Sequence, residues 1–372
     1  MDLLGDLPGV GSMFSFLGKL FSGKAFLIAA FLPALVFVAL NLLLVVPYLP
    51  SQVSTQVISF SLTLPLLEDV KIEGQGLFYT LAPVVIGAAL ILLNTPIIKL
   101  YEGAFSWQRN FLFKPLLEQV RRRHRAKHEK LRALQAEYNR VAAQLERGEG
   151  NPQALQFQLA ALRSYVGEKP SASSIEGLYM DLFSPGGVGW EMPFDEARLM
   201  PTRLGNAFAV IEEYPYRRYG MDGVTFWPRL THVISDDYKA VIDSAKTNLD
   251  SLLNFSLLSG VLGLEFLAMA GYTLANGHQI AAGWFCIGWI VTWIVAYLFY
   301  RATVSATQSM GMQIAACFDL FRGALLDKFH IKRPKDLLAE QAVWRGLAKF
   351  LVSGDAYYYP RSPEKDVKTK DK

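Results

Sequence analysis

The sequence is poor in the residues that build disulfide frameworks and metal centres. Only two of its 372 residues are cysteine, Cys286 and Cys317. Cys286 falls inside an apolar segment and Cys317 in a tail, in a reducing setting, so we expect neither a disulfide nor a zinc site. His124 and His128 have the i,i+4 spacing that can hold a metal, but four arginines nearby would repel a cation. We therefore expect no metal site.

The chain also lacks the motifs of common enzymes. We find no Ser/His/Asp order, no paired catalytic carboxylates in a recognisable frame and no nucleotide fingerprint. The glycine-rich stretch Ser184–Gly189 lacks the Lys-Ser/Thr pair that a P-loop requires. The sequence therefore predicts no recognisable enzyme and no cofactor, although membrane enzymes with unfamiliar sites stay open.

What the chain does contain is four long apolar segments: Ala25–Tyr48, Leu77–Leu100, Leu252–Leu274 and Ile280–Tyr300. Each is close to the roughly 20 residues that an α-helix needs to cross about 30 Å of hydrocarbon. The pattern predicts an all-α membrane protein with four transmembrane helices, arranged as two pairs, and a cytoplasmic helical module.

The charges around these segments predict their orientation. The loop 49–75 has no arginine and the loop 275–279 has no charge, whereas Arg121–Arg125 follows the second segment and Arg301 the fourth. Cytoplasmic loops are enriched in Lys and Arg. We therefore expect a multi-pass protein with both termini and the central insert in the cytoplasm.

The segments divide the chain into six parts. We expect an N-terminal cytoplasmic or interfacial segment (1–24), the first transmembrane pair (25–100), a cytoplasmic helical insert (101–251), the second pair (252–300), a cytoplasmic helical tail (301–360) and a disordered C-terminus (361–372).

The insert begins with a heptad pattern. Positions at spacings of three and four from Leu117 to Leu145 form a seam that is apolar except at His124 and Lys127, near its membrane end. A stripe of the same period follows from Leu155 to Val166. Two glycines and Asn151-Pro152 separate the stripes. The pattern predicts a helical hairpin with coiled-coil character, whose seam can close on its own return helix or on another subunit.

Helical patterns also continue beyond the apolar segments. Asp236–Asp250 is expected to run without a break into segment three, and Met310–Phe329 to continue segment four. A further helix is expected at Leu337–Leu351. The run Tyr214–Gly220 is expected as a proline-bent connector.

Several short motifs lie in the insert and the tail: Leu204-Gly-Asn206, Tyr214-Pro215, Arg218-Tyr-Gly220, Asp222, Trp227-Pro-Arg-Leu230, Phe318-Asp-Leu320, Arg322 and Trp344. With these motifs the chain resembles an uncharacterised family of bacterial four-span membrane proteins. The resemblance implies a bacterial source, hence the inner membrane, and a shared architecture. It implies no activity.

Glu265 is the most distinctive single residue. It lies near the centre of segment three, where an ionised carboxylate is unfavourable and such residues face a bundle interior, a partner or water. One hypothesis is an ion site, a proton site or a gate. The alternative is a protonated side chain that hydrogen-bonds across helices, for example to Asn41, Asn94 or Thr292.

Other residues suggest weaker hypotheses. Pro33 and Pro83 lie inside segments one and two, where we expect kinks that are structural or part of a moving gate. Arg121, Arg122, Arg123 and Arg125 are expected to set topology and to contact anionic lipid. Nucleic acid is not expected, because this run has no aromatic side chains for base stacking.

A group rich in tyrosine and arginine is the last candidate: Tyr214, Tyr216, Arg217, Arg218, Tyr219 and Trp227. Tyr and Arg are favoured at interface hot spots, so the group is a candidate surface for a partner or an anionic ligand. The alternative is packing of the connector against the helical insert.

Two functions follow as expectations. The first is an oligomeric assembly that conducts or gates ions under control of its cytoplasmic module. The second is a non-conducting scaffold or adaptor whose module recruits a cytoplasmic partner. The expected partners are the lipid bilayer, anionic lipids included, and either copies of the chain or a cytoplasmic protein.

Overall fold

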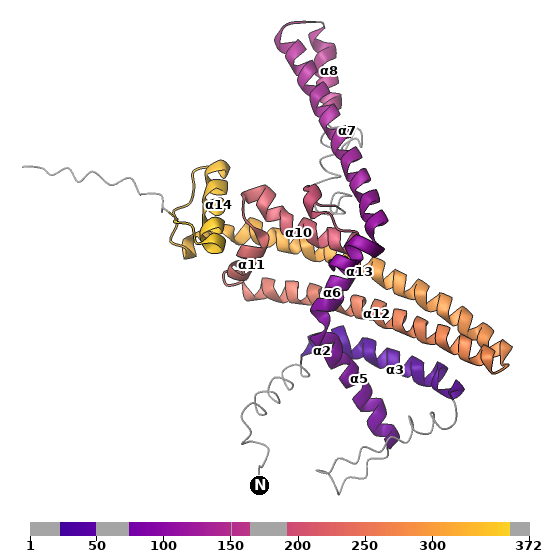
Figure 1. Ribbon diagram of the computed structural model, residues 1–372. Coiled ribbons are helices and arrows are strands. Elements are labelled where there is room, and N and C mark those ends of the chain that lie inside the picture. Colours follow the sequence, from indigo (N-terminus) through magenta and orange to yellow (C-terminus); the bar gives the residue numbers. More distant parts are fainter. Residues whose placement is uncertain (1–22, 50–73, 150, 164–191, 358–372) are drawn as a thin grey trace, which may run out of the picture. The chain divides into compact units, whose positions relative to one another are not determined.

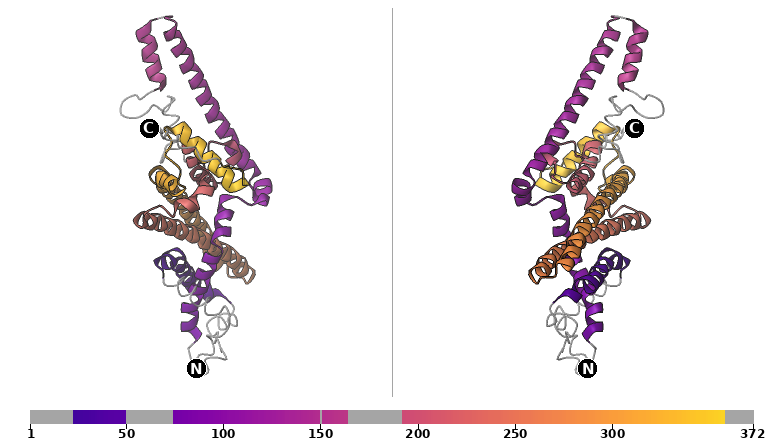
Figure 2. Two further views of the ribbon diagram at one scale, coloured as in Figure 1. Left: turned by 90° about the vertical axis from the view of Figure 1, so that its left-hand side faces the viewer. Right: turned by 90° about the vertical axis from the view of Figure 1, so that its right-hand side faces the viewer.

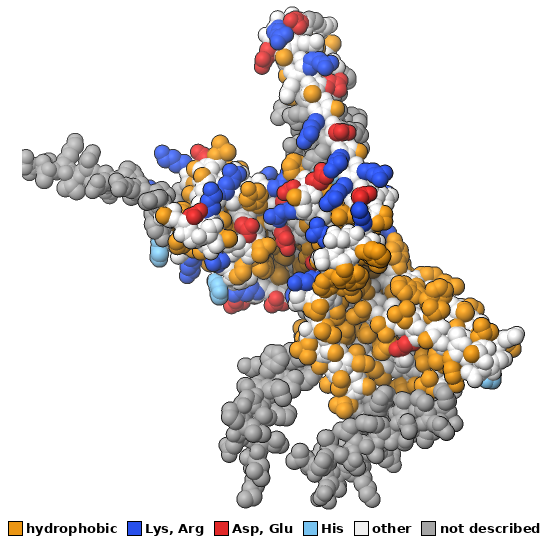
Figure 3. All heavy atoms as spheres, viewed as in Figure 1, with side chains coloured by type: hydrophobic (Ala, Val, Ile, Leu, Met, Phe, Trp, Pro, Cys, Tyr) orange, Lys and Arg blue, Asp and Glu red, His pale blue; other side chains and the backbone are white. Residues whose placement is uncertain are grey.

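The computed structural model describes residues 23–49, 74–149, 151–163 and 192–357. Within these ranges every regular element is a helix, as the sequence predicts (Figure 1). The chain divides into two compact units. Unit 1 comprises Met1–Tyr101 and Asp243–Thr307, and unit 2 comprises Glu102–Ile242 and Gln308–Lys372. Hydrophobic side chains cover most of the visible face of unit 1, whereas charged side chains are spread over unit 2 (Figure 3).

Some predicted segments lie outside the described residues. They are the N-terminal segment before residue 23, most of the loop 49–75, the glycine-rich stretch 184–189 and the C-terminus 361–372.

Three helical stretches are long and apolar enough to cross a membrane: Lys24–Tyr48 with 25 residues, Asp236–Ala275 with 40 and Gln279–Lys328 with 50. A fourth candidate, Leu81–Leu92 with Asn94–Glu102, has the required length and composition only as a bent pair. The structure therefore supports a helical protein with three candidate spans, and the fourth span stays a prediction.

The helices α12 (Asp236–Ala275) and α13 (Gln279–Lys328) are much longer than a span needs. At 1.5 Å per residue they measure about 60 Å and about 75 Å, against about 30 Å of hydrocarbon. Each is one uninterrupted helix, so the prediction of helical continuation into segment three and out of segment four is confirmed.

Segment two differs from the single helix expected from the sequence. Helix α5 (Gly74–Leu92) and helix α6 (Asn94–Glu102) meet at a bend of 62°. Pro96 has no backbone N–H to donate to the Leu92 carbonyl, which is the bond a continuous helix would make there. The sharp bend therefore lies beside Pro96, while Pro83 lies within α5.

Pro33 accompanies a different distortion. It lies at the start of α3 (Leu32–Leu44), which follows α2 (Lys24–Phe26) and the π-helical turn η1 (Leu27–Phe31) and precedes η2 (Val46–Tyr48). A π-helical turn is a common way for a helix to absorb a break in its hydrogen-bond ladder. Pro33 is buried, and helices α3 and α5 lie side by side in unit 1.

Close packing joins the apolar parts of α12 and α13. A Cβ on Gly288 would lie 2.6 Å from the Phe266 ring, and one on Gly263 would lie 2.8 Å from the Thr292 hydroxyl. The rings of Phe255 and Phe299 stack at 5.0 Å. Small residues permit this approach, which is the usual way that helices associate in a membrane.

In unit 2, helices α7 (Lys114–Glu146) and α8 (Pro152–Arg163) form a hairpin (Figures 1 and 2). Gly148 has φ +69° and ends α7, and the Asn151 side chain accepts a hydrogen bond from Gln153 N at 3.0 Å. The turn therefore uses the residues that the sequence indicated. A role for the seam between subunits stays a prediction.

The core of unit 2 is built by α10 (Arg203–Tyr219), α11 (Gly223–Leu230), α14 (Leu337–Ser353) and the polar ends of α12 and α13. Phe226 and Trp344 are fully buried and their rings meet edge to face at 5.1 Å. Helix α14 confirms the predicted helix at 337–351. Tyr214–Gly220 is not a bent connector, however, because α10 continues through Pro215 to Tyr219. Nine of the 17 residues of α10 are buried, and this burial outweighs the unfavourable proline.

Candidate functional site

Glu265 lies on α12 and contacts Asn41 of α3. The Asn41 side chain hydrogen-bonds the Glu265 carboxyl, so it is the partner found among the three that the sequence offered. Within the described residues, the second carboxyl oxygen, Oε2, is buried and has no hydrogen-bond partner. An unsatisfied buried oxygen is unfavourable in an apolar bundle, and it is relieved by a proton, a cation or a water molecule.

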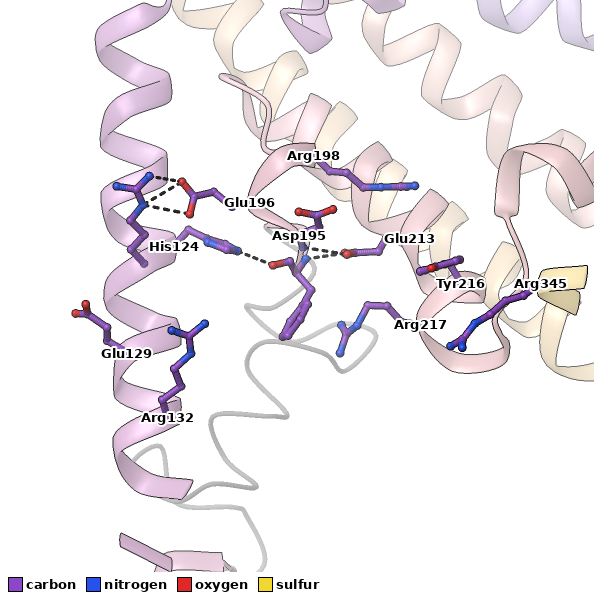
Figure 4. A pocket seen from close by; sticks show the side chains of 12 residues that line it. His124, Glu129, Arg132, Asp195, Glu196, Arg198, Glu213, Tyr216, Arg217 and Arg345 are labelled. Carbon is purple, nitrogen blue, oxygen red and sulfur yellow. Dashed lines mark hydrogen bonds and ion pairs between the residues drawn. The ribbon is translucent and has the colours of Figure 1, made fainter. Parts of the chain in front are cut away.

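A cavity in unit 2 is lined mainly by charged side chains. The cavity has a volume of about 920 Å³, within the range of small-molecule sites. The helices α7, α10 and α14 and the segment 193–198 form its wall (Figure 4). The lining residues are His124, Arg125, Glu129 and Arg132 of α7, Phe194, Asp195, Glu196 and Arg198 of the segment, Glu213, Tyr216 and Arg217 of α10, and Arg345 of α14.

Buried polar groups hold the segment 193–198 in place. Glu213 is buried, and its two carboxyl oxygens accept hydrogen bonds from the backbone N–H groups of Phe194 (2.6 Å) and Asp195 (3.0 Å). On the other side, His124 Nε2 donates to the carbonyls of Pro193 (3.1 Å) and Phe194 (3.0 Å). His124 was expected in the heptad seam, and it serves here to fix the cavity wall.

Arg125 makes the most extensive ion pair of the cavity. Its Nε and Nη2 atoms donate to the two carboxyl oxygens of Glu196 at 2.5 to 3.1 Å. The guanidinium holds the pKa of the Glu196 carboxyl below its usual value. Both groups are exposed, so the pair orients Glu196 more than it stabilises the fold. Asp195 in turn caps the short helix η5 (Glu196–Arg198), accepting from Ala197 N at 2.9 Å.

The remaining charges leave the cavity receptive to anions. Five arginines line the cavity against four carboxylates, and once Arg125 is paired with Glu196, four arginines face Glu129, Asp195 and Glu213. Arg217 lies over the Phe194 ring, 4.4 Å from its centroid. Among the described side chains, Arg132 and Arg345 form no ion pair and no hydrogen bond. They come from α7 and α14 and lie on opposite sides of the cavity (Figure 4).

The predicted Tyr/Arg surface divides into two sets. Tyr216 and Arg217 are exposed and line the cavity, and Arg218 is exposed beside it in sequence. Tyr214 and Tyr219 instead point into the core, and Trp227 packs 6.0 Å from the Phe318 ring. Only part of the group is therefore available to a ligand.

Tyr214 and Tyr219 both donate to Asp319 of α13. The Tyr214 hydroxyl lies 3.0 Å from both carboxyl oxygens, and the Tyr219 hydroxyl lies 2.7 Å from Oδ1. Burial and the Asp319 carboxylate raise the pKa of Tyr214 and of Tyr219 above the ordinary value. Arg322 lies 4.1 Å over the Tyr219 ring and also pairs with Glu340 of α14 at 2.9 Å.

The motifs of the resemblance mostly build this scaffold. Asn206 bridges the chain before α10, accepting from Met200 N at 2.8 Å and donating to the carbonyls of Met200 and Thr202 at 2.9 Å. A Cβ on Gly205 would collide with the Glu102 carbonyl. Asp222 caps α11 through Thr225 N at 2.7 Å. These residues act on the fold and not on a ligand.

The four arginines expected at lipid have different environments. Arg122 and Arg123 are exposed, Arg121 is half-buried, and Arg125 is engaged by Glu196. Sequence reasoning missed Glu196, Arg198, Glu213, Arg132 and Arg345. No local signal marks them, since they come together only when α7, α10 and α14 pack.

Other chemistries gain no support within the part of the chain that the structure describes. No group of three or more His, Cys, Asp or Glu side chains there is arranged to hold a metal ion. Cys317 is fully buried, and burial raises the pKa of its thiol to about 12, which keeps it unreactive.

Comparison with protein-family models, with curated proteins and with solved structures finds no match for this chain.

Proposed function

We propose that this chain is a four-span protein of the bacterial inner membrane, with cytoplasmic termini, whose unit 2 binds a small phosphate-bearing ligand. The observation that carries the proposal is the arginine-lined cavity, in which Arg132 and Arg345 have no partner among the described side chains. The volume of the cavity matches that of small-molecule sites, which favours a free ligand as the occupant.

The choice of phosphate rests on geometry. Guanidinium groups from α7 and α14, together with those of Arg198 and Arg217, present planar donors from several directions. Phosphate offers several acceptor oxygens and accepts such contacts on more than one side. Tyr216 and Phe194 are partly exposed in the same wall and supply aromatic faces for an organic group attached to the phosphate.

Calorimetric titration of the detergent-purified full chain with inorganic pyrophosphate tests this proposal. We expect saturable binding that weakens as salt is added. The double variant Arg132→Ala/Arg345→Ala should lose about tenfold or more in affinity, since each charge-assisted hydrogen bond contributes roughly 1.5–3 kcal/mol. Arg140→Ala is the matched control, because Arg140 is exposed on the same helix and does not line the cavity. Equal affinity in all three proteins would exclude the site.

A second function is favoured by Glu265, whose unsatisfied oxygen lies within a candidate span. We propose that an oligomeric bundle conducts or gates a cation or protons at this residue, under control of unit 2. Flux into liposomes that hold the protein tests it: Glu265→Gln should lower the flux, and Thr292→Val on α13 is the control. Unchanged flux in Glu265→Gln would remove this role, and light scattering in detergent gives the oligomeric state.

A monomer that binds ligand and shows no flux would instead support a membrane scaffold. In that case unit 2 recruits a cytoplasmic partner, and the ligand controls the recruitment.

A further inference from the structure

The connection between α6 and α7 exposes large apolar side chains that belong to none of the hydrophobic cores among the described residues. Helix α6 ends at Glu102, Gly103 takes φ +72°, and a short helical stretch follows that includes the π-helical turn η3 (Gln108–Leu112) before α7 begins at Lys114. Exposed fractions are high at four apolar positions: Phe111 84%, Leu112 54%, Trp107 53% and Leu116 41%.

The same connection also has a buried side. Gln108 and Leu117 are buried, so the segment is anchored in unit 2 and presents a defined outer face. The ring of Phe105 stacks on Trp107 at 6.4 Å with 17° between the planes. Such an ordered apolar face in water is unfavourable by roughly 25 cal/mol for each Å² exposed, which points to a surface that is covered in the working protein.

The charges beside this face are basic. Arg109 and Lys114 flank it, and Arg122 and Arg123 are exposed within the next turns of α7. Glu118 is the only acidic residue between positions 103 and 128. A basic rim around Trp, Phe and Leu is the composition of segments that lie in the interface of an anionic membrane.

We propose that Trp107, Phe111, Leu112 and Leu116 insert into the headgroup region of the bilayer, with the basic residues on anionic lipid, and form an in-plane anchor. Lipid is favoured over a second copy of the chain because α6 belongs to a candidate span and ends only five residues before Trp107. A connection this short keeps Trp107 close to the membrane surface once the span is inserted. Trp is also enriched at that depth. The inference rests on the proposed insertion of segment two in the membrane. It does not depend on ligand binding by the cavity or on ion flux at Glu265.

Site-directed fluorescence tests the anchor in the full-length protein. Cys286 is exposed and is replaced by Ala, whereas Cys317 is buried and stays. An environment-sensitive NBD probe is then attached at Phe111→Cys, in nanodiscs that hold one copy of the chain and contain anionic lipid. Tyr297→Cys, exposed on a candidate span, is the positive control, and Arg140→Cys, exposed on α7, is the negative control.

The expected result at position 111 is a blue-shifted emission that lipids spin-labelled near the headgroup quench, while position 140 stays unquenched. Removal of anionic lipid should weaken the quenching at 111 and leave that at 297 unchanged. Emission at 111 like that at 140 would overturn the proposal. A blue shift that appears only with two or more copies in each disc, without quenching by lipid, would overturn it in favour of a protein interface. Loss of quenching at 297 as well would show that the spans themselves are not inserted.

Discussion

The Asn254 side chain donates a hydrogen bond to the backbone carbonyl of Ala29, with the two atoms 2.8 Å apart. In an α-helix the Ala29 carbonyl would accept from residue 33, but Pro33 has no N–H. Ala29 lies in the π-helical turn η1, and Asn254 of α12 adds a donor at a carbonyl that Pro33 cannot serve. Substitution at Asn254 is expected to lower stability by about 0.6–2 kcal/mol, the range for polar contacts between helices in membranes.

Thermal unfolding in detergent checks this expectation with Asn254→Ala. The matched control is Asn248→Ala, on the same helix but exposed. Equal melting temperatures in the two variants would show that the Ala29 carbonyl does not depend on Asn254.

The second prediction concerns two glycines that end helices in the left-handed conformation. Gly220 (φ +71°) ends α10 and Gly354 (φ +73°) ends α14, so alanine is strained at both by about 1–2 kcal/mol. Only at Gly220 would the added Cβ also crowd the backbone, 2.9 Å from the Gln341 carbonyl. Gly220→Ala should therefore be clearly less stable than Gly354→Ala, by thermal unfolding. Similar losses of stability in the two variants would mean that α14 shifts easily to make room for the added Cβ.

The third prediction is a pH dependence that arises from the Tyr214 hydroxyl. Tyr214 has a pKa raised by burial and by the Asp319 carboxylate, so the folded state favours the protonated hydroxyl. This stabilisation is complete below pH 10, the ordinary tyrosine pKa, and is lost as the pH rises toward the raised pKa. At pH 7, Tyr214→Phe should lower the free energy of unfolding by about 1–3 kcal/mol, because a hydrogen bond to a charged group is lost.

The difference in the free energy of unfolding between wild type and Tyr214→Phe should then become smaller above pH 10. Melting curves at several pH values measure it, and Tyr216→Phe serves as the control, since Tyr216 is exposed. A difference that stays constant through the alkaline range would contradict the role of the Tyr214 proton.

The fourth prediction concerns the ion pair at the cavity wall. Glu196→Gln removes the carboxylate that engages Arg125 and leaves the size of the side chain unchanged. The freed arginine should raise the affinity for pyrophosphate about twofold to fivefold at low salt, with a smaller gain at high salt. Glu146→Gln, at the end of α7 and outside the cavity lining, is the calorimetric control. A loss of affinity would show that Glu196 contacts the ligand.

Helices were largely predictable where local patterns determine them. The polar helical stretch before segment three, the glycines around residue 150 and the apolar side of 337–351 predicted the start of α12, the hairpin turn and α14. The same logic failed at Pro215, because burial of α10 against its neighbours outweighs a local preference. The local pattern also did not predict the bend at Leu93, although Pro96 is visible in the sequence.

The cavity could not be predicted in this way. Arg132 and Arg345 are separated by more than 200 positions, and each taken alone is an ordinary surface arginine of a helix. Asn254 could not be predicted either, since nothing near it in sequence indicates that its side chain donates to a carbonyl of the first span. Such pairs become visible only through tertiary packing.

The contacts of Asp319 separate the residues that maintain the scaffold of unit 2 from those that line its cavity. The motif residues Tyr214, Tyr219, Asp222 and Trp344 cap and fill the scaffold, so selection for folding alone would preserve them. The arginines of the cavity make no comparable contribution to the core. If unit 2 binds a ligand as proposed, substitutions at 132, 198 and 345 would change its specificity and leave the scaffold folded.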